Sequence, residues 1–317
     1  MNIAIILDPL EQIKTYKDST FAVMRAAAWR GHSLFVLRQE DMFWREGSVV
    51  AAARRLDLID NGVDWYTLGE VVEQRLQSFD VVLMRKDPPF DMEYVYSTYL
   101  LELAEAAGAR IFNRPSAIRD FNEKLSIGKF PQLVAPTLVS RDMERIKSFV
   151  AEQGEAVVKP LDGMGGASVF RVSAHDPNRN VIIETLTQLG KRTVMAQRYI
   201  PEIVAGDKRI LIINGKVVPY ALARIPQGGE SRGNLAAGGK GVAQPLSARD
   251  RAIAETVAEV VRREGLFLVG LDVIGDYLTE INVTSPTGMQ EITQQTGLDV
   301  AEMFVQELEH CAVRSEE

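Results

Sequence analysis

Residues 159–168 read Lys-Pro-Leu-Asp-Gly-Met-Gly-Gly-Ala-Ser, a lysine at the end of a predicted strand followed by three glycines within eight residues. Glycines let the backbone bend closely around a ligand and point N–H groups at phosphate oxygens. The spacing is not that of a P-loop, because no Gly-Lys-Ser/Thr opens a helix. Taken alone, the stretch fits either a phosphate-binding loop or a plain β-hairpin with a glycine turn.

The segments on either side of this stretch predict a small α+β unit. A helix-like pattern covers 142–152, and β-type runs at 155–159 and 168–172 flank the glycine-rich loop. A second helical pattern at 178–189 and a strand at 193–198 complete the unit.

The chain that follows predicts a second α+β unit. Two β-type runs, 206–213 and 216–224, are joined by Asn214-Gly215, the strongest short signal for a hairpin. The later elements are a helix at 248–264, strands at 266–274 and 278–283, and a terminal helix from about 298.

Strands and helices alternate in the first part of the chain. Strands are predicted at 2–7, 33–37, 80–84 and 110–113, and helices at 19–30 and 92–107. The alternation predicts an α/β domain with a mostly parallel, doubly wound sheet over roughly the first 120 residues. We divide the chain into an N-terminal α/β domain, 1–122, a central subdomain, 123–200, and a C-terminal subdomain, 201–317.

Two acids and an amide near the end of the chain have the character of a metal site. Glu280 and Asn282 are two apart on a strand and therefore share one face. A three-residue or bulged turn after the preceding strand would place Asp272 opposite Glu280. These oxygen donors suit Mg²⁺ beside nucleotide phosphates. The alternative, ordinary exposed acids, is disfavoured because both strands read as buried.

A basic ribbon precedes this site in the sequence. If Asn214-Gly215 forms a two-residue turn, Arg209 pairs with Tyr220, and both share one face with Asp207 and Arg224. Two guanidinium groups on one face suit a phosphate or carboxylate. A solvated polar face would explain the same pattern equally well.

Residues 225–241 hold six glycines in 17 residues and few large apolar side chains. A loop of this length inside a compact domain is usually a lid or a linker. The strand before it and the helix after it favour a mobile lid that excludes water from a site.

The net charge, the cysteine count and the length of the apolar runs in the 317-residue chain restrict its partners and its compartment. The net charge of −7 argues against nucleic acid as the main partner. The single cysteine, Cys311, suits a reducing compartment. No signal peptide and no apolar run of ~20 residues is seen, so we expect a cytoplasmic protein without a membrane partner.

In this order, the motifs resemble those of an ATP-grasp ligase, and nearly the whole chain is similar to the bacterial glutathione synthetase family. The stretches that carry the resemblance are Met84-Arg-Lys-Asp-Pro-Pro-Phe-Asp91, Asn122-Glu-Lys-Leu125, 159–167, Ala223-Arg-Ile-Pro-Gln-Gly-Gly-Glu230, Arg232-Gly-Asn-Leu-Ala-Ala-Gly-Gly239 and Thr279-Glu-Ile-Asn-Val-Thr-Ser-Pro286. Many ATP-grasp enzymes share the Glu-Ile-Asn element, whereas the Arg-Lys-Asp-Pro-Pro and Asn-Leu-Ala-Ala-Gly-Gly elements are far more specific.

The resemblance implies a fold, a reaction and a set of site residues. The fold would be an N-terminal α/β domain followed by an ATP-grasp fold of two α+β subdomains, the first of them a lid over ATP. The reaction would be ATP-dependent joining of γ-glutamylcysteine and glycine through an acyl phosphate, in a cytoplasmic homotetramer. The implied ATP contacts are Lys124, Lys159, Gly163, Gly165, Gly166, Gln197, Tyr199, Ile200 and Asp207.

The resemblance also assigns the remaining roles. Asp272, Glu280 and Asn282 would hold Mg²⁺ or Mn²⁺. Arg209 and Arg224 would stabilise the reacting groups. The substrates would meet Arg85, Arg224, Asn282 and Ser285, and the lid would use Gly228, Gly229, Arg232 and Asn234.

Two other functions stay open from the sequence. Another ATP-grasp carboxylate–amine ligase, such as one that joins two D-alanines or adds glutamate to a protein, would share the ATP site. A nucleotide-binding regulatory protein without catalysis is disfavoured because the metal-ligand candidates and both arginines are present together.

Overall fold

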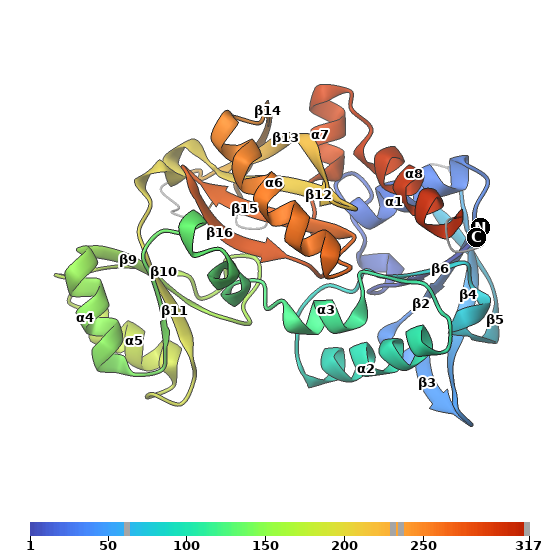
Figure 1. Ribbon diagram of the computed structural model, residues 1–317, viewed down its shortest axis with the longest axis horizontal. Coiled ribbons are helices and arrows are strands. Elements are labelled where there is room, and N and C mark those ends of the chain that lie inside the picture. Colours follow the sequence, from blue (N-terminus) through green and yellow to red (C-terminus); the bar gives the residue numbers. More distant parts are fainter. Residues whose placement is uncertain (60–63, 229–232, 234–237, 314–317) are drawn as a thin grey trace.

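The computed structural model describes residues 1–59, 64–228, 233 and 238–313, and it has three sheets. The N-terminal sheet has seven strands in the order β3-β4-β2-β1-β6-β7, with β5 paired to β4 (Figure 1). Its strands are β1 (Asn2–Ile6), β2 (Ser33–Leu37), β3 (Met42–Arg45), β4 (Ser48–Leu58), β5 (Tyr66–Arg75), β6 (Val81–Met84) and β7 (Ile111–Phe112). Its helices are α1 (Ser19–Trp29), α2 (Met92–Ala106) and α3 (Pro115–Asp120).

The central strand of this sheet explains why the domain has helices on both faces. Ala4 and Ile6 of β1 belong to one buried cluster, and Ile3 and Ile5 belong to the other. A strand buried on both faces is typical of parallel α/β sheets, and β1 runs parallel to both β2 and β6.

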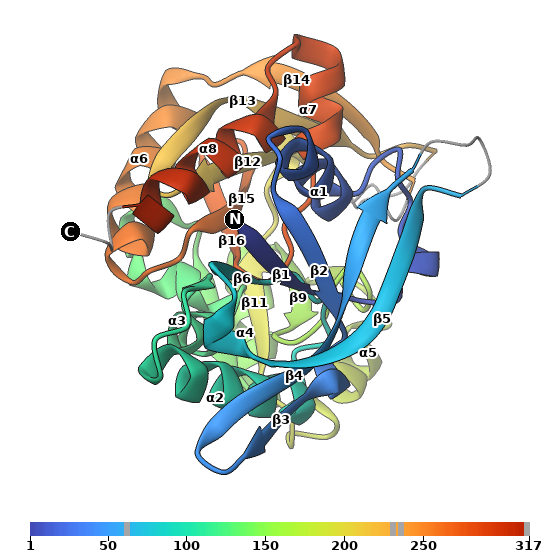
Figure 2. The same ribbon diagram turned by 90° about the vertical axis from the view of Figure 1, so that its right-hand side faces the viewer.

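The expected α/β class is confirmed, and the predicted parallel strands are present, but the sheet is mixed. Residues 42–75, for which the sequence predicts no element, add the antiparallel strands β3, β4 and β5 at one edge. Figure 2 shows these strands extending away from the parallel part of the sheet.

The middle of the chain forms a separate lobe with its own core. Its four antiparallel strands run in the order β10-β9-β11-β8, and helices α4 and α5 pack on one face. The elements are β8 (Thr137–Ser140), α4 (Met143–Gln153), β9 (Glu155–Pro160), β10 (Phe170–Ser173), α5 (Arg179–Thr187) and β11 (Val194–Arg198). Its buried cluster includes Ile146, Val158 and Ile183 and draws only on residues of this lobe.

The last part of the chain builds a five-stranded antiparallel sheet in the order β14-β13-β12-β15-β16. The elements are β12 (Asp207–Ile213), β13 (Lys216–Ile225), β14 (Lys240–Pro245), α6 (Ala248–Arg263), β15 (Leu268–Ile274), β16 (Tyr277–Asn282), α7 (Met289–Thr296) and α8 (Val300–Val313). Helix α8 crosses back to pack on α1, where Arg30 pairs with Glu302 and Glu309 at 2.5 and 2.6 Å. The N-terminal and C-terminal parts therefore share their buried clusters, whereas the lobe projects away from them and contributes Met195 of β11 to one cluster (Figure 1).

The predicted register of the β12–β13 hairpin is wrong, although the predicted face is retained. Arg209 pairs with Leu222 rather than Tyr220, because a bulge shifts the register by two residues between Ile210 and Ile212. The shifted segment contains Pro219, which has no N–H to donate and favours a bulge. An even shift leaves each side chain on its original face.

In the described ranges, no helix is both long and apolar enough to cross a bilayer. The division at residues 122 and 200 stays a prediction.

Candidate active site

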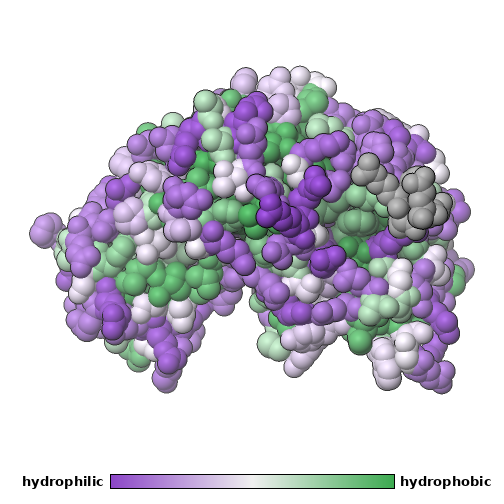
Figure 3. All heavy atoms as spheres, in the orientation of Figure 1, coloured by the Kyte–Doolittle hydropathy of each residue, from purple (hydrophilic) through white to green (hydrophobic). Residues whose placement is uncertain are grey.

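A cleft of about 330 Å³ lies where the lobe faces the C-terminal sheet. Its walls come from β9 and β11 on one side and from β12, β13, β15 and β16 on the other, and Asp87 and Pro88 of the N-terminal domain close one end. In Figure 3 an open notch separates the lobe from the part of the N-terminal domain that carries α2 and α3, and these helices do not line the cleft. Residues from all three parts of the chain therefore meet at one site.

Most of the predicted site residues line this cleft. They are Lys124, Lys159, Gly163, Gly165, Gly166, Gln197, Tyr199, Ile200, Asp207, Arg209, Arg224, Asp272, Glu280, Asn282 and Ser285.

The predicted pairing of the two acidic strands is confirmed. Asp272 lies opposite Glu280, and the register shifts between Asp272 and Val273. The turn itself has only Gly275 and Asp276 between the paired Ile274 and Tyr277, so the bulge supplies the extra residue. Asp272 and Glu280 are thereby placed side by side, facing the lobe.

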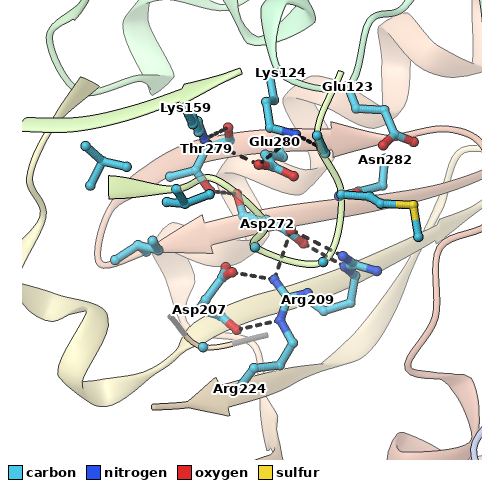
Figure 4. Close-up of a pocket in the computed structure, with 18 of the residues that line it drawn as sticks. Glu123, Lys124, Lys159, Asp207, Arg209, Arg224, Asp272, Thr279, Glu280 and Asn282 are labelled. Atoms are coloured by element: carbon cyan, nitrogen blue, oxygen red, sulfur yellow. Dashed lines mark hydrogen bonds and ion pairs between the residues drawn. The ribbon is translucent and has the colours of Figure 1, made fainter. Parts of the chain in front are cut away.

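Asp272 is the anchor of a buried charge network. Arg209 donates to both of its carboxylate oxygens, at 2.6 and 3.2 Å, and Arg224 approaches at 2.9 Å (Figure 4). Burial would raise the pKa of Asp272, but the two guanidinium groups outweigh it and hold the pKa well below its usual range. Asp272 therefore carries a negative charge that fixes both arginines at the cleft wall.

Asp207 belongs to the same network, but its negative charge is balanced less well than that of Asp272. Its Oδ2 accepts a 2.5 Å bond from Arg224, which is shared with Asp272. Burial raises the pKa of Asp207 to about 7, because Arg224 offsets only part of the desolvation and Asp272 adds repulsion. Oδ1 of Asp207 is buried without a hydrogen-bond partner in the described structure, which leaves one acceptor for a ligand hydroxyl.

Glu280 is held by two lysines from different parts of the chain. Lys159 Nζ at the end of β9 lies 3.3 Å from Oε1, and Lys124 Nζ lies 3.5 Å from the same atom. Lys124 also donates to the carbonyl oxygen of Gly163 at 2.5 Å, which ties the glycine-rich loop to this centre. Both ammonium groups thus point at the carboxylate where phosphate would approach (Figure 4).

The glycine-rich loop, 161–169, connects β9 to β10. Gly165 and Gly166 have φ of 61° and 79°, a conformation that residues with a Cβ adopt only at a cost. The loop joins two antiparallel strands, and Gly163, Gly165 and Gly166 line the cleft, whereas phosphate binding by this loop stays a prediction.

The far end of the cleft has the character of a base-binding slot. Gln197 lies near the end of β11, Tyr199 and Ile200 follow the strand, and the apolar residues Val157 and Ile274 line the same cleft. The Gln197 side chain is fixed by a 3.0 Å bond to Thr137 Oγ1.

Asn282 offers an oxygen toward the cleft. Its Nδ2 donates to the carbonyl oxygen of Gly270 at 2.9 Å, so Oδ1 is turned away from that strand. The described residues include no group of three or more His, Cys, Asp and Glu side chains placed to hold a metal. The candidate donor set is two carboxylates plus this amide oxygen, which fits a hard cation such as Mg²⁺.

Arg85 lies outside the lining of the cleft, contrary to the expected substrate contact. It is 7% exposed, and it donates to Thr20 Oγ1 at 3.1 Å and to the carbonyl oxygens of Thr284 and Pro286, each at 3.4 Å. Burial lowers its pKa, and the charges of Asp18 and Asp87 oppose that effect. In this geometry Arg85 supports the 284–286 backbone behind Ser285.

Two acidic side chains in the cleft, Glu123 and Asp87, are not among the predicted site residues. Glu123 Oε1 accepts bonds from the backbone N–H groups of Val283 and Thr284, at 2.9 and 3.2 Å, and from the Thr284 hydroxyl. Asp87 accepts from the Ser285 hydroxyl. Glu123 and Asp87 lie within stretches that carry the family resemblance, but their partners are about 160 to 200 residues away, which no local pattern indicates.

The lid prediction falls largely outside the described residues. This holds for Gly229, Arg232 and Asn234. Gly228 has φ of 61° with open space around it, and Gly233 lies against Asp207 and the carbonyl of Arg224.

The comparisons with known proteins agree across the whole chain. Residues 1–119 match the N-terminal domain of prokaryotic glutathione synthetase, and residues 123–297 match its ATP-grasp domain. A glutathione synthetase of Nitrosomonas europaea is 57% identical over 317 residues, with 99% of each chain covered. One of Ralstonia nicotianae is 58% identical over 312 residues, with 98% of this chain and 96% of the relative covered.

Solved structures with the same fold are more distant in sequence. D-cycloserine synthetase DcsG aligns with a TM-score of 0.66 at 18% identity, covering 98% of this chain and 100% of that one. The ATP-grasp ligase PsnB, complexed with minimal precursor, Mg and ADP, gives 0.63 at 16%, covering 98% of each chain. These two structural similarities bear on the fold alone. The family models match both domains, and the two glutathione synthetases align over nearly the whole chain. The chain belongs to the prokaryotic glutathione synthetase family of ATP-grasp ligases.

Proposed function

We propose that this protein joins the cysteinyl carboxylate of γ-glutamylcysteine to the amine of glycine, with conversion of ATP to ADP and phosphate. The observation that carries the proposal is one cleft in which two lysines and two arginines converge between an apolar slot and a polar end. The identity of more than half of the residues to proteins named glutathione synthetase supports the choice of substrates.

The paired cations suit both chemical steps. The carboxylate attacks the γ-phosphorus of ATP, and the amine then attacks the acyl phosphate and expels phosphate. Lys124 and Lys159 lie together at Glu280, where they would neutralise charge on the transferring phosphoryl group. Arg209 and Arg224 would stabilise the oxyanion of the tetrahedral intermediate, because Asp272 holds them in place before the substrate arrives.

The nucleotide would lie along the cleft from the slot to the lysines. Gln197, Tyr199 and Ile200 would surround the adenine, and the free Oδ1 of Asp207 would accept a hydrogen bond from a ribose hydroxyl. The backbone of the loop that contains Gly163, Gly165 and Gly166 would cover the phosphates.

A bound Mg²⁺ or Mn²⁺ would neutralise negative charge on the nucleotide phosphates. Asp272, Glu280 and Asn282 are the residues that would hold it, and their oxygen donors fit such an ion. PsnB, which shares this fold, has been solved with Mg and ADP.

The substrates and the assembly complete the proposal. Arg224, Asn282 and Ser285 would border the peptide and the acceptor, Arg85 would support Ser285 from behind, and residues 225–241 would act as a lid against water. We further propose a cytoplasmic homotetramer.

The test is ADP release from the purified protein with ATP, Mg²⁺, γ-glutamylcysteine and glycine, omitting each in turn. Release that requires all four, with glutathione identified by mass, is the expected result. ADP release with another acid–amine pair, but not with this one, would show that the protein is an ATP-grasp ligase with different substrates. Bound ATP without release for any pair would overturn the assignment as a ligase.

A further inference from the structure

The carboxylates that line the cleft differ in how their charge is balanced. Asp272 faces two arginines and Glu280 faces two lysines. Asp87 lines the same cleft, and within the described ranges it forms an ion pair with no lysine, arginine or histidine. The residue is exposed overall, although its carboxylate is partly buried where it lines the cleft.

Asp87 is nevertheless held firmly. It follows β6 at the carboxyl end of the strand, and its backbone N–H donates to Asp8 Oδ2 at 2.8 Å. The neighbouring Lys86 pairs with the other oxygen of Asp8 at 2.8 Å instead of with Asp87. The Asp87 side chain reaches across to accept a hydrogen bond from Ser285, which joins the N-terminal domain to the segment after β16. Only Oδ1 takes part in that bond, and Oδ2 accepts no hydrogen bond from another described residue.

The chemistry of the second step requires a group of this kind. An amino acid reaches the cleft at neutral pH as an ammonium ion, which cannot attack an acyl phosphate until it loses a proton. Lys124, Lys159, Arg209 and Arg224 all repel an ammonium ion. In the described ranges, Asp87 and Glu123 are the cleft carboxylates that form no ion pair with a lysine or arginine. Glu123 is turned to the backbone N–H groups of Val283 and Thr284, so Asp87 is the better placed of the two to attract a positive charge.

We propose that Asp87 binds the ammonium group of the acceptor amino acid and takes the proton that it must lose before attack, with Ser285 fixing the carboxylate. This inference rests on the proposed ligase function and names a catalytic residue for its second step.

The step balances as follows. One N–H proton passes to an Asp87 carboxylate oxygen, and the nitrogen lone pair forms the C–N bond. The C–O bond to phosphate then breaks with its electron pair on phosphate, and the second proton leaves the nitrogen to the released phosphate.

The surroundings of Asp87 favour proton uptake. Burial raises its pKa above the ordinary value, the Ser285 bond and Arg85 offset part of that rise, and Asp8 and Asp18 add to it. A carboxylate with a raised pKa is a stronger base than an ordinary aspartate, while it remains a good partner for a cation.

The experiment compares two nucleophiles in the Asp87→Asn variant, which keeps the shape and can still accept from Ser285. Glycine must be bound as an ammonium ion and must lose a proton before it attacks. Hydroxylamine is largely uncharged at neutral pH, so it traps acyl phosphates without either step. With ATP, Mg²⁺ and γ-glutamylcysteine, kcat/KM for glycine should fall about 10²-fold. Hydroxamate formation and the KM values for ATP and γ-glutamylcysteine should stay close to those of the wild type.

Two further variants sharpen the result. Glu93→Gln removes the same charge from an exposed residue in the first turn of α2, outside the cleft lining, and should leave both nucleophiles unaffected. Asp87→Glu restores a carboxylate and should recover part of the glycine reaction.

Each outcome decides the proposal. Equal loss with glycine and hydroxylamine in Asp87→Asn would show that the residue acts in the first step or in folding, and would overturn it. A rise in KM confined to γ-glutamylcysteine would instead assign Asp87 to the ammonium of the donor peptide. Failure of the wild type to form product from this pair would refute the proposed function itself, independently of Asp87.

Discussion

Gly270 on β15 has no side chain because Arg209 and Pro286 occupy the space where one would lie. A Cβ at this position would be 2.7 Å from Pro286 Cβ and 2.9 Å from Arg209 Cδ. Ordinary carbon contacts are ~3.5–4.0 Å, so Gly270→Ala requires these groups to move by roughly 0.6 to 1.3 Å. The movement would pull the Arg209 guanidinium from Asp272, to which it donates at 2.6 and 3.2 Å.

We expect this single methyl to affect both stability and catalysis. Overpacking of a buried strand should lower the free energy of unfolding by about 1–3 kcal/mol. Misplacing a catalytic group by ~1 Å should lower kcat by about 10²-fold. The measurements are urea unfolding and ADP release with all substrates present. Gly128→Ala is the matched control, because nothing lies within 4 Å of its Cβ position, and its stability should change by less than about 1 kcal/mol. Wild-type unfolding and kcat in Gly270→Ala would refute the reasoning.

Three other predictions concern the metal donors, the lid and the buried charge network. Glu280→Gln or Asn282→Ala should remove most product formation with an unchanged circular dichroism spectrum; turnover retained by both would argue against the metal assignment. Replacing 226–240 by a short linker should raise ATP hydrolysis relative to ligation, and an unchanged ratio of ADP to peptide product would contradict a lid. The pKa of Asp207 is raised in the folded protein, so ionisation of Asp207 opposes folding. The stability contributed by its protonated carboxyl is fully present below the ordinary pKa of aspartate and is lost as pH rises through about 7. Asp207→Asn should therefore narrow the difference between the unfolding midpoints at pH 5 and pH 8. An equal difference in the variant and the wild type would argue against this effect of Asp207 ionisation on stability.

The sequence predicts the elements that carry the chemistry because their signals are local. Asp272 and Glu280 could be placed opposite one another from strand alternation and turn length alone, and the structure has the required bulge. The glycine-rich loop after Lys159 is likewise specified by glycines where the backbone has positive φ.

The elements that escaped prediction depend on distant partners. Strand β4 reads Ser-Val-Val-Ala-Ala-Ala-Arg-Arg-Leu-Asp-Leu, with no steady alternation, and it becomes a strand by pairing with β2, β3 and β5. The register of the β12–β13 hairpin differs from the predicted one, although Pro219 is a local signal for a bulge. Arg85 was assigned to the substrate from its motif, but its buried bonds to the 284–286 backbone exist only in the folded chain.

The pairing of charges inside the cleft has a consequence for how ligands are bound. A buried cation or carboxylate left alone would cost several kcal/mol, so the folded chain pairs Lys124 and Lys159 with Glu280. An arriving phosphate exchanges one anionic partner for another instead of meeting bare positive charge. The net gain in charge energy is then modest, and much of the affinity for a nucleotide must come from the apolar slot. The ion pairs hold the lysines and arginines in fixed positions before a ligand binds, and such preorganised charges stabilise a transition state. Asp87 departs from the pattern, since no lysine or arginine in the described part of the chain forms an ion pair with it, and the ligand proposed to bind there is itself a cation.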